Sequence, residues 1–202
     1  MSRPGLDEYF MGFARQAAAR ATCDRGRSGA VIVVDGQVVS TGYVGAAKGL
    51  PHCDDVGHLI REVTYLDEGK GFSIGDSCPR CDSGVLEKKP GTEESLKCIN
   101  GCGCTFLHDR GPVREHCMRT AHAEGNAIVQ AAKHGIAING GTMYCKMEPC
   151  LRCCVDIING GIKRVVAEYR YHGAAVTREW FKLVGVELVV LNDENAKYEE
   201  KK

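Results

Sequence analysis

The sequence lacks an excess of charge of either sign, because 26 lysines and arginines balance 26 aspartates and glutamates. Proteins that hold nucleic acid gather positive charge on one face, so this composition argues against nucleic acid as the main partner. The sequence also has no hydrophobic run long enough to cross a bilayer. The early segment LDEYFMGFARQAAAR carries Asp7, Glu8, Arg15 and Arg20, which is unlike the apolar core of a signal peptide. We therefore expect a cytoplasmic protein without a membrane partner.

Cysteine, in contrast, is abundant, at 12 of the 202 residues. Without a secretory signal, so many thiols indicate metal binding in a reducing compartment rather than a framework of disulfides. The hydrophobic share of 44% is sufficient for a core. The length fits one ordinary domain, or one domain with a small insert.

Hydrophobic periodicity and turn residues predict helices that alternate with short apolar strands. We expect helices at 6–21, 121–134, 150–159 and 174–184, and strands at 29–34, 37–43, 142–146, 163–168 and 186–191. The first two strands form a hairpin, because Asp35-Gly36 is a favoured turn pair. Residues 44–120 are expected to be irregular, and a charged tail begins at Asn192. The alternation predicts an α/β sheet with helices on both faces.

Two short motifs carry the chemistry. His122-Ala-Glu124 and Pro149-Cys150-Leu-Arg-Cys153 together spell H-x-E…P-C-x-x-C, the pattern of zinc-dependent nucleobase deaminases. One imidazole and two thiolates can hold Zn²⁺ and leave a fourth position for water. Each motif stands at a predicted helix start, where the helix dipole favours a thiolate over a thiol.

The residue types suit hydrolytic removal of an amino group. Zinc with three protein ligands lowers the pKa of its water to roughly 7, and the hydroxide can attack C4 of a cytosine ring. Glu124 would take the proton from the water, protonate N3 of the ring and deliver a proton to the leaving ammonia. An H-x-E triplet alone is common, and C-x-x-C alone is compatible with a redox or structural site. The ordered combination favours a catalytic zinc site with His122, Cys150 and Cys153 as ligands.

Several further segments belong together. They are EYFM at 8–11, SGAVIV at 28–33, GYVGAAKGLPHC at 42–53, HAEGNAI at 122–128, EPCLRCC at 148–154 and INGGIKRVV at 158–166. They resemble the deoxycytidylate (dCMP) deaminase family of the cytidine-deaminase-like superfamily. The resemblance implies a three-layer αβα fold with a five-stranded mixed sheet, a homo-oligomer (hexamer or dimer), and conversion of dCMP to dUMP for dTMP synthesis. It also implies activation by dCTP and inhibition by dTTP in many members, with Mg²⁺ accompanying such a nucleotide effector.

The resemblance also suggests substrate contacts. Asn126 matches the family's Asn in HAE-x-N-A-I, and Tyr171 lies in a segment similar to a K-Y-H-D loop beside the nucleotide, although Gly173 replaces its Asp. Arg25 and Arg27 lie in the loop ATCDRGRSG, where their guanidinium groups could hold the 5′-phosphate or could simply be solvated.

One departure from the family bears on the substrate. Val44 stands where the family's G-Y-N-G segment has an Asn that is expected to hydrogen-bond the sugar. A valine cannot make that bond, and an unpaired hydroxyl costs roughly 1–3 kcal/mol. Either another residue binds the 3′-hydroxyl, or the substrate is a modified deoxycytidylate, a nucleoside or a base.

A second, structural zinc is implied by the resemblance as well, because many bacterial and phage members carry one. The matching ligands are Cys23, Cys53, His58 and Cys117. Four such ligands close a tetrahedron and leave no open position. His52 and His116 are rival ligands, and free buried thiols are the alternative.

The remaining cysteine motif, CPRC at 78–81 followed by CINGCGC at 98–104, resembles the zinc ribbons at the ends of bacterial type I topoisomerases. The predicted ligands are Cys78, Cys81, Cys98 and Cys104, with Cys102 as the alternative to Cys104. Typical family members have a short loop here, so we expect a zinc-ribbon insert at 70–110 within a deaminase domain of 1–192, followed by a charged tail at 193–202. Its mixed charges favour a structural lid or an oligomer contact; a disordered loop is the alternative.

Three functions are therefore open. The first is a deaminase of free dCMP. The second is a zinc deaminase of another substrate, such as a modified deoxycytidylate, a nucleoside or an RNA base, although an RNA-acting enzyme should show a basic face. The third is a non-catalytic zinc-binding scaffold, and the intact Glu124 argues against it.

Overall fold

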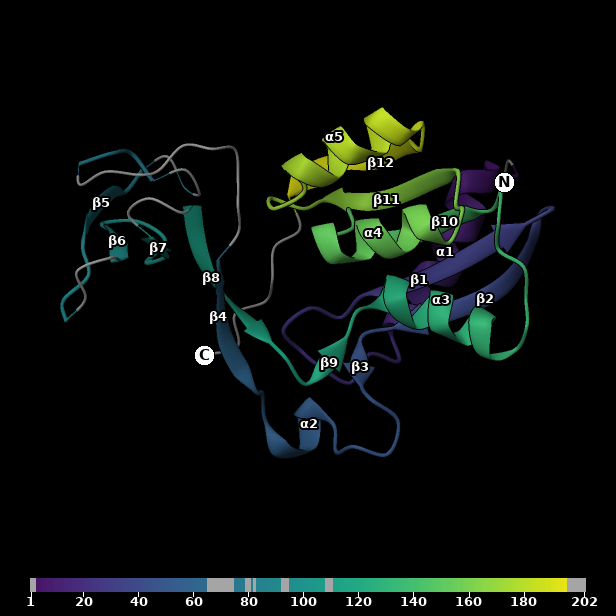
Figure 1. The fold of residues 1–202 in the computed structure, drawn as a ribbon, viewed down its shortest axis with the longest axis horizontal. Coiled ribbons are helices and arrows are strands. Elements are labelled where there is room, and N and C mark those ends of the chain that lie inside the picture. The colour runs from purple at the N-terminus through teal and green to yellow at the C-terminus, as the bar shows by residue number, and fades with distance from the viewer. Residues whose placement is uncertain are drawn as a thin grey trace. The chain divides into compact units, whose positions relative to one another are not determined.

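The computed structural model describes residues 3–64, 75–78, 81, 83–91, 95–107 and 111–195. The chain divides into two compact units, Met1–Leu59 with Met118–Lys202, and Ile60–Cys117. Each unit has a five-stranded sheet of its own (Figure 1). Parts of the expected insert and tail, at 70–74, 79–80, 82, 92–94, 108–110 and 196–202, lie outside the described residues.

The first unit is built on a mixed sheet with the strand order β12-β11-β10-β1-β2 (Figure 1). Its strands are β1 (Gly29–Val34), β2 (Gln37–Tyr43), β10 (Thr142–Met147), β11 (Arg164–Arg170) and β12 (Glu187–Asn195). Strand β1 is antiparallel to both of its neighbours, whereas β10, β11 and β12 run parallel to one another. The predicted α/β architecture and the five-stranded mixed sheet are confirmed. Strand β12 runs past its expected end at Leu191, because Arg170 of β11 pairs with Asn195.

The turn between β1 and β2 explains why the predicted hairpin forms. Asp35 and Gly36 both adopt positive φ, at 49° and 73°. A type I′ turn needs positive φ at both central residues, and Asp-Gly tolerates this better than most pairs. The hairpin places β2 at the edge of the sheet, where it contacts helix α3.

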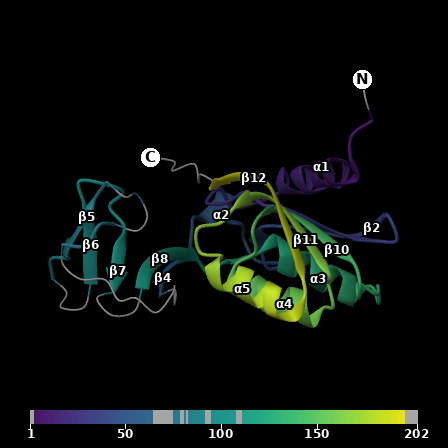
Figure 2. The ribbon, with the colours of Figure 1, turned by 90° about the horizontal axis from the view of Figure 1, so that it is seen from above.

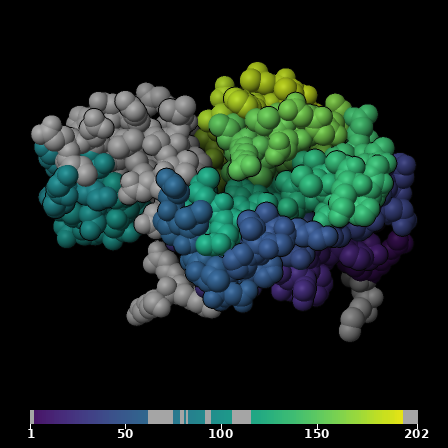
Figure 3. Space-filling view, turned by 60° about the horizontal axis from the view of Figure 1, so that its bottom comes forward, coloured from purple at the N-terminus to yellow at the C-terminus, as the bar shows by residue number. Residues whose placement is uncertain are grey.

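Helices cover both faces of this sheet. They are α1 (Leu6–Ala18), α3 (Ala123–Lys133), α4 (Leu151–Asn159) and α5 (Ala175–Val184). Figure 2 shows α1 on one face and the other three helices on the opposite face, and Figure 3 shows α3, α4 and α5 side by side at the surface. No helix within the described ranges combines the length and the apolar character needed to cross a bilayer.

Alternating residues of the strands supply two hydrophobic clusters, one on each face. Val31 of β1 packs with Phe10 and Met11 of α1. The next residue, Ile32, belongs to the opposite cluster, with Phe181 of α5 and residues of α3 and α4. Each such fully buried side chain stabilises the fold by about 1.5–3 kcal/mol. The sheet therefore holds the helices that carry the predicted site in fixed positions.

Two glycines let helices approach the sheet closely. A Cβ on Gly42 would lie 2.2 Å from the carbonyl oxygen of Ala123 and 2.4 Å from the amide nitrogen of Ala127, both in α3. A Cβ on Gly29 would lie 2.3 Å from the carbonyl oxygen of Ala14 in α1. The Ser40 hydroxyl also donates a 2.6 Å hydrogen bond to the Ala127 carbonyl. Strand β2 and α3 are thus held in backbone contact.

The expectation that residues 44–120 are irregular is wrong for the described residues. This stretch contains β3 (Gly45–Ala46), α2 (Cys53–Val56), β4 (Ile60–Thr64), β5 (Val85–Lys88), β6 (Ser95–Ile99), β7 (Thr105–Leu107), β8 (Gly111–Cys117) and β9 (Thr120–Ala121). Most of these strands are too short for their alternation to be read in the sequence. The antiparallel sheet of the second unit has the order β4-β8-β7-β6-β5, and Cys78, Leu86, Leu96 and Cys98 form its small core.

Candidate metal and catalytic site

The two zinc-type motifs stand at the N-termini of neighbouring helices. His122 is the N-cap of α3 and Cys150 is the N-cap of α4, and both have extended backbone conformations. Pro149 keeps Glu148, the residue before it, out of the helical region, so α4 cannot begin earlier in the chain. Glu124 and Cys153 lie in the first turns of the two helices. Strand β9, which pairs with β3, leads into the cap of α3, and β10 of the mixed sheet ends shortly before the cap of α4.

His122, Cys150 and Cys153 are brought together, with ligand atoms within 4.8 Å of one another. Each sulfur lies 3.4 Å from His122 Nδ1, and the two sulfurs are 3.7 Å apart. Zinc bond lengths of about 2.3 Å to sulfur and about 2.0–2.1 Å to nitrogen give tetrahedral S–S and S–N separations of about 3.8 Å and about 3.5–3.6 Å. The distances therefore fit three corners of a zinc tetrahedron.

The protonation chemistry of this group also fits a divalent cation. A hydrogen bond with Cys153, together with the neighbouring His122, lowers the pKa of Cys150 to about 3. The hydrogen bond with Cys150 and burial raise the pKa of Cys153. The hydrogen bond with Cys150 raises the pKa of His122 to about 9. One thiolate thus forms readily beside an imidazolium, and a bound cation would favour the second thiolate and the neutral imidazole.

The Glu124 carboxylate lies beside this group. Its Oε2 is 3.6 Å from Cys153 Sγ, and the residue is only 6% exposed. Burial raises the pKa of this carboxyl above its usual range. Glu124 is thus a buried carboxyl next to the three possible metal ligands, which makes it the candidate group for proton transfer.

The predicted substrate residues surround this region with defined partners. The amide nitrogen of Asn126 donates a 2.8 Å hydrogen bond to the carbonyl of Tyr43. Val44 is partly buried against the α3 side of the core. Gly45 after it pairs with Ala121, directly before His122. The structure therefore brings Asn126 and the segment around Val44 together at the start of α3.

The other predicted substrate residues lie on two loops. Arg25 is half-buried in the loop between α1 and β1, and Arg27 is exposed there. Arg27 donates to the Ala21 carbonyl and forms a 3.4 Å ion pair with Asp54. Tyr171 is buried after β11, with its ring centroid 4.6 Å from that of His172. The roles of these residues in binding stay predictions.

A second group of possible ligands matches the expected structural site. It consists of Cys23, Cys53, His58 and Cys117. His58 Nδ1 lies 3.7 Å from Cys23 Sγ, which fits a shared zinc. Cys117 is the residue directly before Met118, where the chain re-enters the first unit. The rivals His52 and His116 do not belong to this group within the described residues.

The third group lies in the second unit. It consists of Cys78, Cys81, Cys98 and Cys102, so it holds the alternative ligand Cys102. The sulfurs of Cys78 and Cys102 are 3.6 Å apart, and those of Cys81 and Cys98 are 3.8 Å apart. Both distances fit a tetrahedral zinc. Cys104 Sγ lies 3.0 Å from Cys102 Sγ, so it stands next to the group.

Glycines make room for these sulfurs. A Cβ on Gly84 would lie 2.2 Å from Cys98 Sγ, and one on Gly101 would lie 2.7 Å from Cys81 Sγ. The backbone therefore turns tightly around the thiols, as in the knuckles of small zinc sites. All 12 cysteines of the chain are thiols rather than disulfides.

Some residues around the candidate sites were not singled out from the sequence. Asp24 Oδ1 lies 3.0 Å from His58 Nε2, on the ring nitrogen opposite Cys23, so it can orient the imidazole. Glu148, directly before Pro149, is buried and binds Arg178 of α5 through both oxygens. The sequence signals for Glu148 are its place directly before Pro149 and its inclusion in the family-like segment EPCLRCC. Nothing in the sequence spacing links Glu148 to Arg178.

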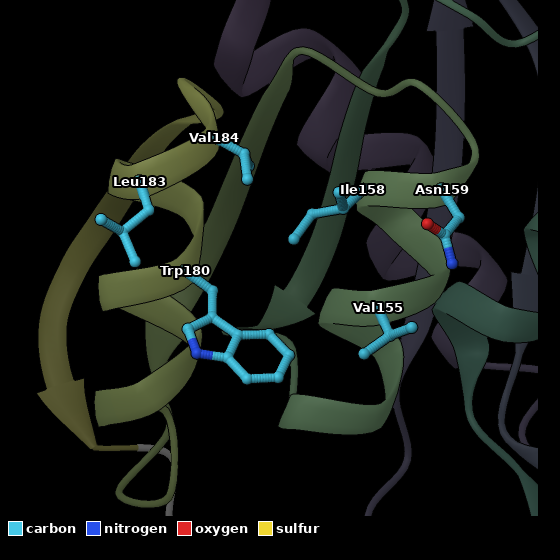
Figure 4. A pocket seen from close by; sticks show the side chains of 6 residues that line it. All are labelled: Val155, Ile158, Asn159, Trp180, Leu183 and Val184. Carbon is cyan, nitrogen blue, oxygen red and sulfur yellow. The ribbon is translucent and has the colours of Figure 1, made fainter.

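A shallow apolar groove of about 340 Å³ lies between α4 and α5 (Figure 4). Its lining residues are Val155, Ile158, Asn159, Trp180, Leu183 and Val184. It contains none of the predicted site residues. Leu183 is 74% exposed, so this face is an apolar surface rather than a polar substrate site.

Comparisons with known proteins agree with these motifs. The model of the cytidine and deoxycytidylate deaminase zinc-binding region matches residues 4–169. ComE operon protein 2 of Bacillus subtilis is 30% identical over 186 residues, covering 92% of this chain and 71% of that protein. The deoxycytidylate deaminase of Mycobacterium phage D29 is 34% identical over 166 residues, covering 82% of this chain and 96% of that protein. The chain spans only 44% and 43% of the deoxycytidylate deaminases of Schizosaccharomyces pombe and Saccharomyces cerevisiae.

A solved structure supports the fold. The dCMP deaminase from the cyanophage S-TIM5 in complex with dCMP and dUMP aligns with a TM-score of 0.56 at 19% identity. The alignment covers 94% of this chain and 99% of that chain. At this identity the likeness concerns the fold alone.

Proposed function

Because this chain belongs to the cytidine and deoxycytidylate deaminase zinc-binding family, we propose that it hydrolyses dCMP to dUMP and ammonia. The observation that carries this proposal is the buried Glu124 carboxylate beside the group of His122, Cys150 and Cys153. The D29 phage deoxycytidylate deaminase, which this chain covers almost completely, supports dCMP as the substrate. Since dUMP is the precursor of dTMP, the reaction would supply dTMP synthesis.

The roles of the residues follow from their chemistry. His122, Cys150 and Cys153 would hold Zn²⁺, which supplies Lewis-acid activation of water at its open position. Glu124 would accept a proton from that water at its carboxylate and donate it to N3 of the cytosine ring. The same carboxylate would then accept the second proton of the attacking water oxygen and deliver it to the amino group, so that the C4–N bond breaks, the C4 carbonyl forms and ammonia leaves.

The substrate would lie between the α3 start and the neighbouring loops. Asn126 is held by the Tyr43 carbonyl, which leaves its amide oxygen to accept a bond from the sugar or the base. Arg25 and Arg27 would bind the 5′-phosphate, and Tyr171 would contact the nucleotide from the loop after β11. Val44 offers the sugar no polar contact, which keeps a modified deoxycytidylate as the second candidate substrate.

We also propose two structural zincs. Cys23, Cys53, His58 and Cys117 would close the first, and Asp24 would orient the His58 ring. Metal analysis of protein purified without chelator should then give three zinc ions per chain, one for each thiol-containing group. A single zinc per chain would remove both structural sites.

The second proposed structural zinc is that of the zinc-ribbon insert. Its four sulfurs come from Cys78, Cys81, Cys98 and Cys102, with Cys104 close enough to exchange with Cys102. The core of this unit is small, so metal binding would supply much of its folding free energy. In this proposal the 70–110 insert is a subdomain within the 1–192 deaminase domain, and 193–202 is a charged tail whose residues 193–195 form the end of β12.

The proposal extends to the assembly, regulation and compartment of the enzyme. A homo-oligomer, either a dimer or a hexamer, would cover exposed apolar residues such as Leu183 and Trp180. Regulation by dCTP and dTTP with Mg²⁺ rests on the family resemblance. The 12 cysteines are thiols rather than disulfides, which supports a reducing compartment such as the cytoplasm.

A substrate panel tests the proposal. Ammonia release is measured with cytosine, cytidine, deoxycytidine, CMP, dCMP, dCTP and 5-modified dCMP under the same conditions. We expect dCMP to have the highest kcat/KM. Faster turnover of a 5-modified dCMP would show that the pocket around Val44 is shaped for another nucleotide. Release from none of them would support a non-catalytic scaffold.

A further inference from the structure

The Glu148 carboxylate is the most enclosed acidic group near the candidate catalytic site. Its side chain is 0% exposed, and it lies directly before Pro149 and Cys150. Arg178 of α5 donates to both of its oxygens, from Nε to Oε1 at 2.9 Å and from Nη2 to Oε2 at 2.7 Å. A planar guanidinium bound in this two-pronged way fixes the orientation of a carboxylate more firmly than a single bond does.

The same carboxylate holds a second segment. The backbone N–H of Tyr171 donates to Glu148 Oε2 at 2.9 Å, and Arg178 Nη2 also donates to the Tyr171 carbonyl at 3.3 Å. Arg170 Nη1 lies 3.5 Å from Glu148 Oε1. The carboxylate thus joins the end of β10, the loop after β11 and helix α5. All three are parts of the first unit.

The loop after β11 has a feature that points to a ligand. The Nε2 atom of His172 is buried and has no hydrogen-bond partner within the described residues. Buried polar atoms in folded proteins are almost always paired, so an unpaired ring nitrogen indicates a partner that binds there. His172 directly follows Tyr171, whose backbone the Glu148 carboxylate and Arg178 hold.

We propose that Glu148 and Arg178 are a positioning pair for deamination. Arg178 orients the Glu148 carboxylate, and this carboxylate fixes the Tyr171–His172 loop relative to the zinc ligand Cys150. The inference rests on the proposed function and deepens it. Both residues act through Tyr171, His172 and Cys150, so substrate affinity and metal retention should depend on them more than the chemical step does.

A matched ion pair elsewhere in the same unit provides the control. Arg164 of β11 donates to both oxygens of Asp7 in α1, at 2.7 Å and 2.9 Å. The two arginine side chains have similar exposure, 27% for Arg164 and 38% for Arg178. The Arg164 pair ties α1 to the sheet on the face opposite the zinc-type motifs. A purely structural role would lower stability in both variants, and more for the Arg178 pair because Glu148 is 0% exposed and Asp7 is 33% exposed, but it would change neither KM nor zinc release.

The experiment compares Arg178→Met with Arg164→Met in the zinc-loaded protein. Methionine keeps most of the length of the side chain and removes its charge and donors. For Arg178→Met we expect a roughly tenfold rise in KM for dCMP, with kcat within about threefold of wild type, because the pair affects binding geometry. We also expect the catalytic zinc to pass to a chelator roughly tenfold faster. A Cys150→Ser variant shows which phase of zinc release belongs to this site. Arg164→Met should lower Tm without either change.

A fallback keeps the test decisive if Arg178→Met does not fold. Combining it with Glu148→Gln leaves no buried charge unpaired, so this double variant should fold and show the same rise in KM. The pair has no positioning role if Arg164→Met gives equal changes in KM and zinc release, or if the Arg178 variants leave both unchanged. Zinc release is measured without substrate, so it tests the pair even if wild type fails to deaminate dCMP. Failure of the zinc-loaded wild type to deaminate dCMP would overturn the proposed function.

Discussion

The contact between Gly42 and α3 gives the sharpest link between the fold and the site. An alanine at this position would place its Cβ 2.2 Å from the Ala123 carbonyl oxygen, where an ordinary contact is 3.4 Å or more. Since both partners are backbone, α3 must move by about 1 Å relative to β2. This shift would carry His122 and Glu124 away from Cys150. Overpacking of this kind costs about 1–3 kcal/mol, or roughly 2–12 °C in Tm for a chain of this size.

Gly29→Ala is the matched control for Gly42→Ala. Its Cβ would lie 2.3 Å from the Ala14 carbonyl oxygen, so it displaces α1, which carries none of the zinc-type ligands. Both variants should lose similar Tm in thermal unfolding followed by circular dichroism. Only Gly42→Ala should lose kcat/KM for dCMP by roughly 10²-fold, since a displacement of about 1 Å at a catalytic group has that effect. Equal activity losses in the two variants, or full activity in Gly42→Ala at reduced Tm, would refute this reasoning.

Three further predictions concern single groups. Glu124→Ala should keep its zinc by metal analysis and lose at least about 10²-fold in dCMP turnover, and near-normal turnover would remove the proton-transfer role. The double variant Cys78→Ser, Cys81→Ser should lose one zinc, and the backbone amides of the second unit should lose their protection from hydrogen exchange, while the catalytic zinc stays bound. Loss of all zinc would contradict this. Arg164 holds the pKa of Asp7 below its usual 3.8, so this pair stabilises the fold above that pH and less as pH falls through the lowered pKa. In urea unfolding Asp7→Asn should therefore be less stable than wild type at pH 7 and nearly equal to it well below pH 3.8; a constant difference would argue against the linkage.

The fold of the first unit could be predicted because its signals are local. Most strands of the mixed sheet contain a short apolar run, such as GAVIVV in β1, and α4 has a recognisable start at Pro149. The Asp35-Gly36 pair predicted the hairpin for the same reason. The zinc-type motifs are also local, since each one places one functional residue at an N-cap and a second in the following turn.

Other features depend on long-range contacts that cannot be predicted from the sequence. The strands of the second unit are short and carry mixed charge, so their alternation could not be separated from irregular chain. The pairing of Glu148 with Arg178 joins residues on different elements and has no fixed spacing. Likewise, the approach of Gly42 to α3 depends on how β2 and α3 pack, which only the assembled sheet defines. These features are therefore determined by long-range packing, which the local motifs do not define.

The central claim is that the group of His122, Cys150 and Cys153 makes this protein a zinc-dependent dCMP deaminase. The most direct measurement follows dUMP and ammonia from dCMP by chromatography and a coupled ammonia assay, using protein as purified, chelator-stripped protein and stripped protein with zinc restored. The account predicts equal amounts of dUMP and ammonia from the purified protein, loss of both after stripping, and their return with zinc. Undiminished turnover in protein shown by metal analysis to be free of zinc, or no dUMP from zinc-loaded protein, would contradict it.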